Sequence, residues 1–433
     1  MEDGVLTVGD GYRAKNDELG PAGLPFARAG NIDAGFNFVG ADCLRTERIE
    51  LAGEKVSRVG DVVFTSKGTV GRFAFVAPAT PKFVYSPQLC FWRSLRPSEL
   101  DPAYLFVWMR GGGFGRQVDA VKGQTDMADY VSLRDQRAMV VDLPPIGEQR
   151  RIARIIGALD DKIELNRRMN ETLEAMARAL FKSWFVDFDP VRAKAEGRAP
   201  AGMDAATAAL FPSRLVQTAE GEVPEGWDWT TLRDLTVKIG SGATPRGGEA
   251  GYVQEGIALV RSQNVYDMNF AWDGLARITD QAAHDLSSVS LCEGDVLINI
   301  TGASFLRTCI VDPGVLPARV NQHVAIVRAG PGVSPRFIHL QLLSERVRGY
   351  LAGLDAGASR QAITKGHLES VLLPKPSPGV IAAFDQVVCP LYARRDRNGA
   401  EARTLSKVRD ALLPRLLSGE LRLGDTLARE DAA

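Results

Sequence analysis

The sequence predicts an α+β protein built as a tandem duplication, in which two similar mixed α/β domains are separated by two long antiparallel coiled-coil helices. Three observations predict this fold class. No proline lies between Pro145 and Pro190, and the composition of this stretch favours one helix of about 38 residues. The spacing of its apolar residues recurs 232 positions later in the chain. Short β-branched and aromatic segments, bounded by glycine and proline, precede each helix and indicate strands. We therefore expect two halves related by an approximate two-fold axis.

The two helices carry matching coiled-coil seams, because their seam positions alternate in steps of four and three. Asn166 and Asn170 interrupt the apolar seam at its centre, which weakens a helix pair but fixes its register. Pro390 lies inside the second helix and predicts a kink or a new start there. The predicted seam residues are Ile152, Ile156, Leu159, Ile163, Asn166, Leu173 and Leu180, facing Leu391, Asn398, Leu405 and Leu412.

The repeat also extends into the segments before the helices. A separation that drifts by only two residues over half the chain indicates duplication of a whole domain with its helix. The matching pairs, 233 or 234 positions apart, are Gly60/Gly294, Gly68/Gly302, Gln88/Gln322, Arg28/Arg261 and Asn31/Asn264.

These patterns set the expected domain boundaries. The domains cover residues 1–143 and 223–374, the helices 144–186 and 375–417, the connector 187–222, and a frayed tail 418–433. Phe185, Phe188 and Phe211 are candidate anchors of the connector. The first domain lacks the tryptophan-containing opening of the second (Trp227 and Trp229), so its N-terminal strand is absent or formed differently.

Within the domains, strands are expected where β-branched and aromatic residues cluster. Proline at the start of residues 102–110 predicts a short helix. The glycine-rich segment 111–116 is interpreted as a plain loop, because no Lys-Ser/Thr pair follows it as in a phosphate-binding loop. The expected strands lie in residues 32–39, 60–65, 72–77, 256–265, 294–302 and 323–329.

Composition limits the class of protein. Hydrophobic residues make up 45% and charged residues 24% of the 433 positions, as in globular proteins. The five cysteines form no CxxC pair and no disulfide-like spacing, which suits a reducing cytoplasm. No signal peptide or membrane-spanning run is predicted. The net charge of −1 means that a nucleic-acid surface would have to be local or be completed by a partner.

Several phrases resemble the specificity subunit of type I restriction–modification enzymes. They are LPPIGEQRRIARIIGALDDKIELN, FKSWFVDFDPVRAKAEGR, VPEGWDW, GDVLINITGA and LLPRLLSGEL. The resemblance covers residues from about Gly11 to Leu423 and implies that the globular parts are target recognition domains, which bind one half-site each of a bipartite, asymmetric double-stranded DNA sequence. It also implies that the helices space the domains and bind two methylase subunits.

The resemblance further implies which chemistry belongs to partners. The methylase subunits methylate adenine with S-adenosylmethionine, and restriction/translocase subunits hydrolyse ATP, with Mg²⁺ expected there too. This chain would then be non-catalytic and need no cofactor or metal of its own. In agreement, the sequence has no GxxxxGK[ST] segment, no metal-ligand spacing around its four histidines, and no Asn-Pro-Pro-aromatic tetrapeptide.

Two other classes of protein remain as alternatives. One is a protein–protein scaffold with two interaction domains on a helical rod and no nucleic acid, which the duplication supports equally. The other is a catalytically fused enzyme, which the absent motifs disfavour. The specific phrases of the helices and connector favour the restriction–modification interpretation over both.

Candidate DNA-contacting residues are the Arg, Lys, Asn and Gln side chains in loops or at strand ends, since these residue types recognise base edges and phosphates. Residues repeated in both domains, such as Asn31 and Asn264, are equally explained as scaffold. The candidates are Arg28, Asn31, Lys67, Arg72, Gln88, Lys122 and Gln124 in the first domain, and Arg261, Gln263, Asn264, Asn299, Arg307, Asn321, Gln322, Arg360 and Gln361 in the second.

Overall fold

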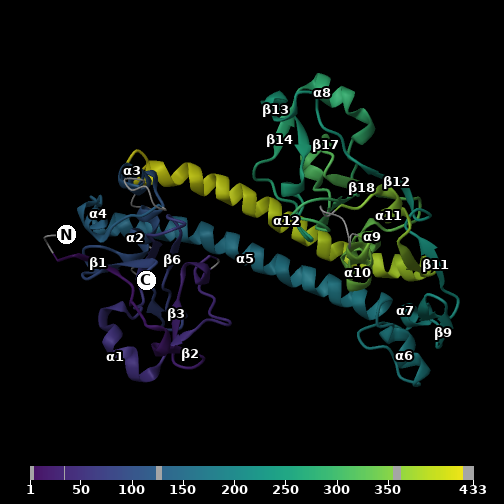
Figure 1. Ribbon diagram of the computed structural model, residues 1–433, viewed down its shortest axis with the longest axis horizontal. Helices are drawn as coiled ribbons and strands as arrows, with labels where there is room; N and C mark the ends of the chain where they lie inside the picture. Colours follow the sequence, from purple (N-terminus) through teal and green to yellow (C-terminus); the bar gives the residue numbers. More distant parts are fainter. Residues whose placement is uncertain (1–3, 34, 123–128, 355–361, 423–433) are drawn as a thin grey trace. The chain divides into compact units, whose positions relative to one another are not determined.

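The computed structural model describes residues 4–33, 35–122, 129–354 and 362–422. These divide into two compact units, one made of residues up to Asn166 together with those from Glu401, the other of Arg167–Ala400. Each unit holds one globular domain and part of each of two 40-residue helices, α5 (Ile146–Phe185) and α12 (Pro378–Leu417) (Figure 1). The protein is therefore of the α+β class, as predicted. None of the helices among these residues is apolar over a length that could cross a membrane.

A four-stranded antiparallel sheet forms the centre of each domain, and its strand order is the same in both. The order is β1-β8-β5-β6 in the first and β12-β18-β15-β16 in the second. The strands are β1 (Leu6–Asp10), β5 (Val62–Thr65), β6 (Phe73–Phe75) and β8 (Leu89–Ser94), matched by β12 (Thr236–Ser241), β15 (Val296–Asn299), β16 (Thr308–Ile310) and β18 (Val324–Ala329). The first domain thus forms its N-terminal edge with β1, placed as β12 is in the second.

A second, smaller sheet in each domain contains one parallel pair. In the first domain β3 pairs with β7 in parallel, and in the second β13 pairs with β17. The strands are β2 (Leu19–Gly20), β3 (Leu24–Ala27), β4 (Cys43–Leu44) and β7 (Val84–Tyr85), and β13 (Tyr252–Val260), β14 (Ala276–Ile278) and β17 (Ala318–Val320). The second domain also has a ribbon of β11 (Asp228–Thr231) and β19 (Leu372–Lys375), which contains Trp229.

Helices pack against the sheets of each domain. The helix predicted for residues 102–110 forms over Pro102–Met109 (α2), with Pro102 in its first turn. The helices are α1 (Ile49–Ala52), α2 (Pro102–Met109), α3 (Gly112–Val121) and α4 (Leu133–Ala138) in the first domain, and α8 (Asp280–Asp285), α9 (Pro335–Leu343), α10 (Glu345–Gly353) and α11 (Lys365–Glu369) in the second. The connector contains α6 (Asp189–Ala195), α7 (Ala205–Ala209) and the hairpin β9 (Leu215–Thr218)–β10 (Gly221–Pro224).

Two local predictions are wrong. The glycine-rich segment 111–116 is not a plain loop, because α3 begins at Gly112. Helix α3 buries Phe114, whose ring lies 5.5 Å from the ring of Trp92, and this burial outweighs the low helix propensity of glycine. The described residues of 32–39 form only an isolated bridge, between Asp33 and Gly35, and no strand. The ring of Phe36 instead lies 4.7 Å from that of Phe83, so the aromatic pattern reflects packing.

The duplication is visible in identical structural devices. Gly60 and Gly294 both have positive φ, +90° and +82°, and each lies against the proline that starts the covering helix. The next residue, Asp61 or Asp295, is fully buried and accepts hydrogen bonds from an arginine of the neighbouring strand. The Gly-Asp sequence occurs in both domains because both form the same turn. The hydrogen bonds show that one predicted pair is wrong: the counterpart of Gln88 is His323, not Gln322. Ser66 and Ile300 are equivalent in the repeat, and their N–H groups donate to Gln88 O and His323 O respectively.

The apolar cores extend from the domains onto the helix ends. In the first unit Ile152 and Ile156 of α5 and Leu413 and Leu416 of α12 belong to the same buried cluster as Trp92. In the second unit Phe185 packs its ring 4.9 Å from Phe384, within an aromatic cluster that also buries Phe188 and Phe211. The predicted anchoring of the connector by these phenylalanines is therefore confirmed. Deep in the second unit, burial lowers the pKa of His339 to about 3, so its ring is neutral.

In each unit the segments of α5 and α12 run antiparallel. In the first unit Arg409 of α12 donates to Asp160 at 2.9 Å, and Asn166 donates to Glu401 at 2.9 Å. In the second unit Asn398 donates to Asn170 Oδ1 at 2.9 Å. The partner's number falls along α12 as the number rises along α5, which defines the antiparallel direction.

The helix interruptions behave differently from one another. α12 continues through Pro390, so a new start there is wrong; burial of Val388 and Tyr392 on either side of the proline holds the helix together. The seam asparagines Asn166 and Asn398 are 1% exposed. Of the predicted apolar seam, Ile152 and Ile156 are buried, while the following residues are half-buried: Leu159, Ile163, Leu173, Leu180, Leu391, Leu405 and Leu412.

Replacing Asn166 and Asn398 together with leucine is expected to leave the chain folded while loosening the register of the helices. The hydrogen bonds of the two amides to Glu401 and Asn170 are lost, whereas apolar seam residues tolerate several registers. We expect unchanged or raised thermal stability, together with altered association in analytical ultracentrifugation. A variant that is strongly destabilised, or one indistinguishable from wild type in both measurements, would contradict this role of the asparagines.

Candidate nucleic-acid interface

Loops from distant parts of the chain meet at one end of the central sheet in each domain. In the first domain, Ser66 N–H donates to Gln88 O at 3.2 Å and Val131 N–H donates to Ser66 O at 2.9 Å. In the second domain, the corresponding bonds run from Ile300 to His323 and from Ile363 to Ile300, both at 3.0 Å. We call this surface the loop edge. It consists of residues 65–72, 86–88 and 129–131 in the first domain, and 299–307, 321–323 and 362–363 in the second.

A further turn is tied to each loop edge. In the first domain Arg72 of the β5–β6 hairpin forms an ion pair with Asp33, which follows the turn at residues 29–31. In the second domain the Asn299 side chain donates to Ser262 O at 2.9 Å, within the turn at residues 262–264. Both domains therefore fix the same set of loops relative to the sheet.

The repeated asparagines are scaffold. Asn31 Oδ1 accepts from Arg28 N–H at 2.8 Å and its amide donates to Asn37 O at 2.9 Å. Asn264 makes the equivalent bonds to Arg261 N–H and Ala271 O, at 3.0 and 2.9 Å. Since each side chain is held by the bonds that close its own turn, its orientation is set by the scaffold and not by a base edge.

Most candidate cations at these surfaces are already paired with carboxylates. Arg28 pairs with Asp42 at 2.8 Å, Lys122 with Asp129 at 3.0 Å, and Arg261 with Glu249 at 3.2 Å, while Arg72 is held by Asp33. Within the described residues of the loop edges, Lys67 and Arg307 have no carboxylate within ion-pair distance. Arg307 lies over the ring of Tyr266, with its guanidinium carbon 4.5 Å from the ring centroid.

The remaining amide candidates divide into structural and exposed groups. Asn299 and Asn321 are buried, and the Asn321 side chain accepts from His323 N–H at 3.1 Å. Gln263 donates to Gly274 O at 3.0 Å. Gln88 and Gln322 are exposed on the loop edges. Gln124, Arg360 and Gln361 lie outside the described residues. Thus Lys67 and Gln88 lie on the first loop edge, and Arg307 and Gln322 on the second, while the other described candidates are hydrogen-bonded, paired or buried.

Sequence reasoning missed two side chains of the second loop edge, Thr301 and His323, and Tyr266, over which Arg307 lies. Thr301 Oγ1 lies 2.8 Å from His323 Nδ1, and Gln322 Nε2 lies 3.0 Å from His323 Nε2. The signal was present in the repeat, because His323 is the structural counterpart of Gln88. It was hidden by the coincidental alignment of Gln88 with Gln322.

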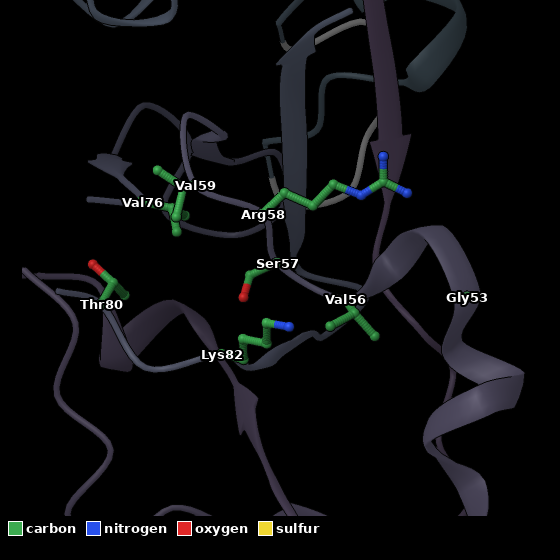
Figure 2. Close-up of a pocket in the computed structure, with 8 residues that line it drawn as sticks. All are labelled: Gly53, Val56, Ser57, Arg58, Val59, Val76, Thr80 and Lys82. Carbon is green, nitrogen blue, oxygen red and sulfur yellow. The ribbon is translucent and has the colours of Figure 1, made fainter. Parts of the chain in front are cut away.

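A pocket in the first domain lies away from the loop edge. Figure 2 shows this cavity of about 330 Å³, with the amino group of Lys82 directed toward Ser57 and Val56. Its wall includes Val59 and Val76, beside the turn that leads into β5, whereas the loop edge follows the other end of β5. Among the described residues, no group of three His, Cys, Asp or Glu side chains is arranged to hold a metal ion.

The comparisons with known proteins agree with this architecture. No family model matches the chain. The chain is 26% identical over 416 residues to the type I restriction enzyme HindI specificity subunit of Haemophilus influenzae, covering 85% of this chain and 88% of that protein. It is 24% identical over 285 residues to the type I restriction enzyme MjaIX specificity subunit of Methanocaldococcus jannaschii, covering 65% and 61% respectively.

The fold is shared with a solved structure as well. The crystal structure of the type I restriction–modification system S subunit from M. genitalium aligns with 96% of this chain and 94% of that one, with a TM-score of 0.58 and 14% identity. The architecture defines a duplicated, two-domain protein with a pair of long helices. Its curated homologues are specificity subunits of type I restriction enzymes, which confirms the resemblance found in the sequence.

Proposed function

We propose that this chain is the DNA specificity subunit of a type I restriction–modification complex, in which each domain recognises one half-site of a bipartite, asymmetric double-stranded DNA sequence. The observation that carries this proposal is the paired loop edge. The same scaffold is built twice, with identical residues at several of its turns, yet the exposed side chains differ between the copies. Two copies with different exposed residues suit two different half-sites.

The partners follow from the same proposal. Two methylase subunits dock on the helices, and restriction/translocase subunits join the complex in the cytoplasm. S-adenosylmethionine, ATP and Mg²⁺ are bound by those partners, and this chain selects the sequence without catalysing a reaction. The scarcity of unpaired cations at the loop edges supports a shared interface, since phosphate contacts by Lys and Arg supply most of the affinity for DNA.

The experiment that tests the function is to sequence modified adenines in DNA from cells that carry this chain together with its methylase partner. We expect methylation at one asymmetric interrupted motif, which disappears when the chain is deleted. Methylation that is independent of the chain, or that has no interrupted motif, would contradict the proposal. An unchanged methylation pattern would favour the alternative of a protein–protein scaffold.

The isolated chain is expected to bind DNA weakly. Only a few loop-edge cations lack a carboxylate partner, and the net charge is −1, so few counterions are released on binding. Fluorescence anisotropy at physiological salt should give a dissociation constant in the micromolar range or above for the chain alone, typical of non-specific binding. Addition of methylase subunits should tighten binding to the specific site by at least about a thousandfold. Nanomolar specific binding by the chain alone would contradict this expectation.

A further inference from the structure

The two domains contain the same scaffold, which allows scaffold and recognition residues to be separated by position. Pairs that are identical in both domains are engaged internally: Asn31 and Asn264 close their turns, and the buried Asp61 and Asp295 accept hydrogen bonds from Arg93 and Arg328. Identity at these positions is explained by the fold. The residues that can distinguish two half-sites must therefore be equivalent in place, exposed, and different in chemistry.

Two pairs of positions at the loop edges meet these conditions. Lys67 and Thr301 are equivalent because each forms an isolated bridge with the segment that returns to the sheet, at Tyr130 and Ala362. Gln88 and His323 are equivalent because their carbonyls accept the bonds from Ser66 and Ile300. Lys67, Gln88 and His323 are exposed and Thr301 is partly exposed, so the side chains of both pairs are accessible from solvent.

In the second domain these side chains are joined into one hydrogen-bonded unit. The amide nitrogen of Gln322 can only donate, so His323 Nε2, 3.0 Å away, accepts. The ring hydrogen then sits on Nδ1 and is donated to Thr301 Oγ1 at 2.8 Å. This leaves the Gln322 carbonyl oxygen as an acceptor and the Thr301 hydroxyl as a donor, because both groups keep unused capacity.

We propose that Thr301, His323 and Gln322 form the base-recognition unit of the second domain, and that Lys67 with Gln88 occupies the same place in the first. The inference rests on the proposed function and names the residues that determine its specificity. The Gln322 amide keeps its carbonyl oxygen and its second N–H, and this acceptor beside a donor complements the major-groove edge of adenine, which offers N6–H and N7. Lys67 offers donors only and complements guanine O6 and N7. His323 is a positioning residue, which orients the Gln322 amide.

The test uses the full chain with its methylase subunits. His323→Ala and Thr301→Val each break the unit at an accessible position, and Gln281→Ala, an exposed glutamine of α8, is the matched control. Each variant is compared with wild type by thermal unfolding and by sequencing of methylated adenines in randomised DNA. We expect unchanged unfolding temperatures. In the second half-site, both variants should reduce the preference for adenine at one position by at least about tenfold, while the first half-site and the control remain unchanged.

A double variant provides an independent readout. Thr301→Lys with His323→Gln gives the second domain the side chains of the first at these two positions, with Gln322 unchanged, and we expect the affected position to shift from adenine toward guanine. A wild-type interrupted motif that stays unchanged in all variants would overturn this inference and leave the proposed function standing. A change in the first half-site would overturn the assignment of the unit to the second. Absence of an interrupted motif in the wild type would overturn both the function and the inference.

Discussion

Replacing Asp61 with alanine is expected to lower the free energy of unfolding of the first domain by about 3–5 kcal/mol. Asp61 is fully buried, and its carboxylate accepts from Arg93 Nε at 2.6 Å, Arg93 Nη2 at 2.7 Å and the Tyr85 hydroxyl at 2.7 Å. The Arg93 side chain is only 5% exposed. Removing the carboxylate leaves a buried guanidinium and a buried hydroxyl without their main partner, and this penalty exceeds the strength of the lost bonds.

Hydrogen exchange of β5 and β8 measures this loss within the first domain, while exchange in β15 and β18 reports the second. Asp42→Ala removes a carboxylate from the exposed pair with Arg28 and should change stability by no more than about 1 kcal/mol.

Asp295→Ala should destabilise the second domain less than Asp61→Ala destabilises the first, because its partner Arg328 is 28% exposed. In the complete complex, Asp61→Ala should abolish selection of one half-site and retain the other. Equal stability of the Asp61 and Asp42 variants would refute the buried-pair argument.

The duplication could be predicted from sequence because it depends on local requirements. The turn before the strand requires a residue with positive φ, which explains Gly60 and Gly294. A buried carboxylate follows each turn, which explains Asp61 and Asp295. The long helices were equally predictable, since continuous spacing and composition suffice. The burial of one face of α3 was missed because Phe114 packs against Trp92 and Trp108. Trp92 is distant in sequence, and the local pattern around Trp108 does not indicate this contact.

The loop edges were harder to predict, because proximity there depends on the sheet. Nothing in the local sequence places Thr301 beside His323, and Asn264 resembles a DNA-contacting residue as much as a turn-closing one. Only the hydrogen bonds show that Asn264 is used internally and that His323 replaces Gln88. Lys67 and Gln88 were included as candidates on residue type alone. The structure adds their common position, which is the property that a recognition surface requires.

A fragment of residues 1–186 is expected to pair with a second copy, and substitutions at its helix end should strengthen the pairing. In the first unit of the intact chain, Leu413 and Leu416 of α12 pack into the domain core, and Leu417 lies so close to Gly111 that a Cβ there would be 2.4 Å from its Cδ1. The repeat of 232 positions places Phe181, Trp184 and Phe185 of the second copy at these three sites. Larger side chains in a filled core cost about 1–3 kcal/mol each.

The polar centre of the helix pair does not oppose such a dimer. Asn398, which donates to Asn170 at 2.9 Å, corresponds to Asn166 in the repeat, so two Asn166–Asn170 contacts can form between copies. Asp160 loses Arg409, whose counterpart is Ala177, but keeps Arg110 at 2.6 Å. Packing of the helix ends, rather than the seam, is therefore the obstacle to pairing.

The fragment carrying Phe181→Leu, Trp184→Leu and Phe185→Leu should dimerise at micromolar concentration in analytical ultracentrifugation, and the unsubstituted fragment should do so more weakly. Leu173→Asp, at a seam position outside the domain core, is the control that should abolish pairing. A symmetric dimer carries the same recognition domain twice. Co-expressed with the methylase, it should modify a palindrome built from the first half-site, in place of the asymmetric site. A substituted fragment that stays monomeric would contradict the pairing of the two seams. A fragment that still directs methylation to the asymmetric site would show that recognition is not divided between the two domains.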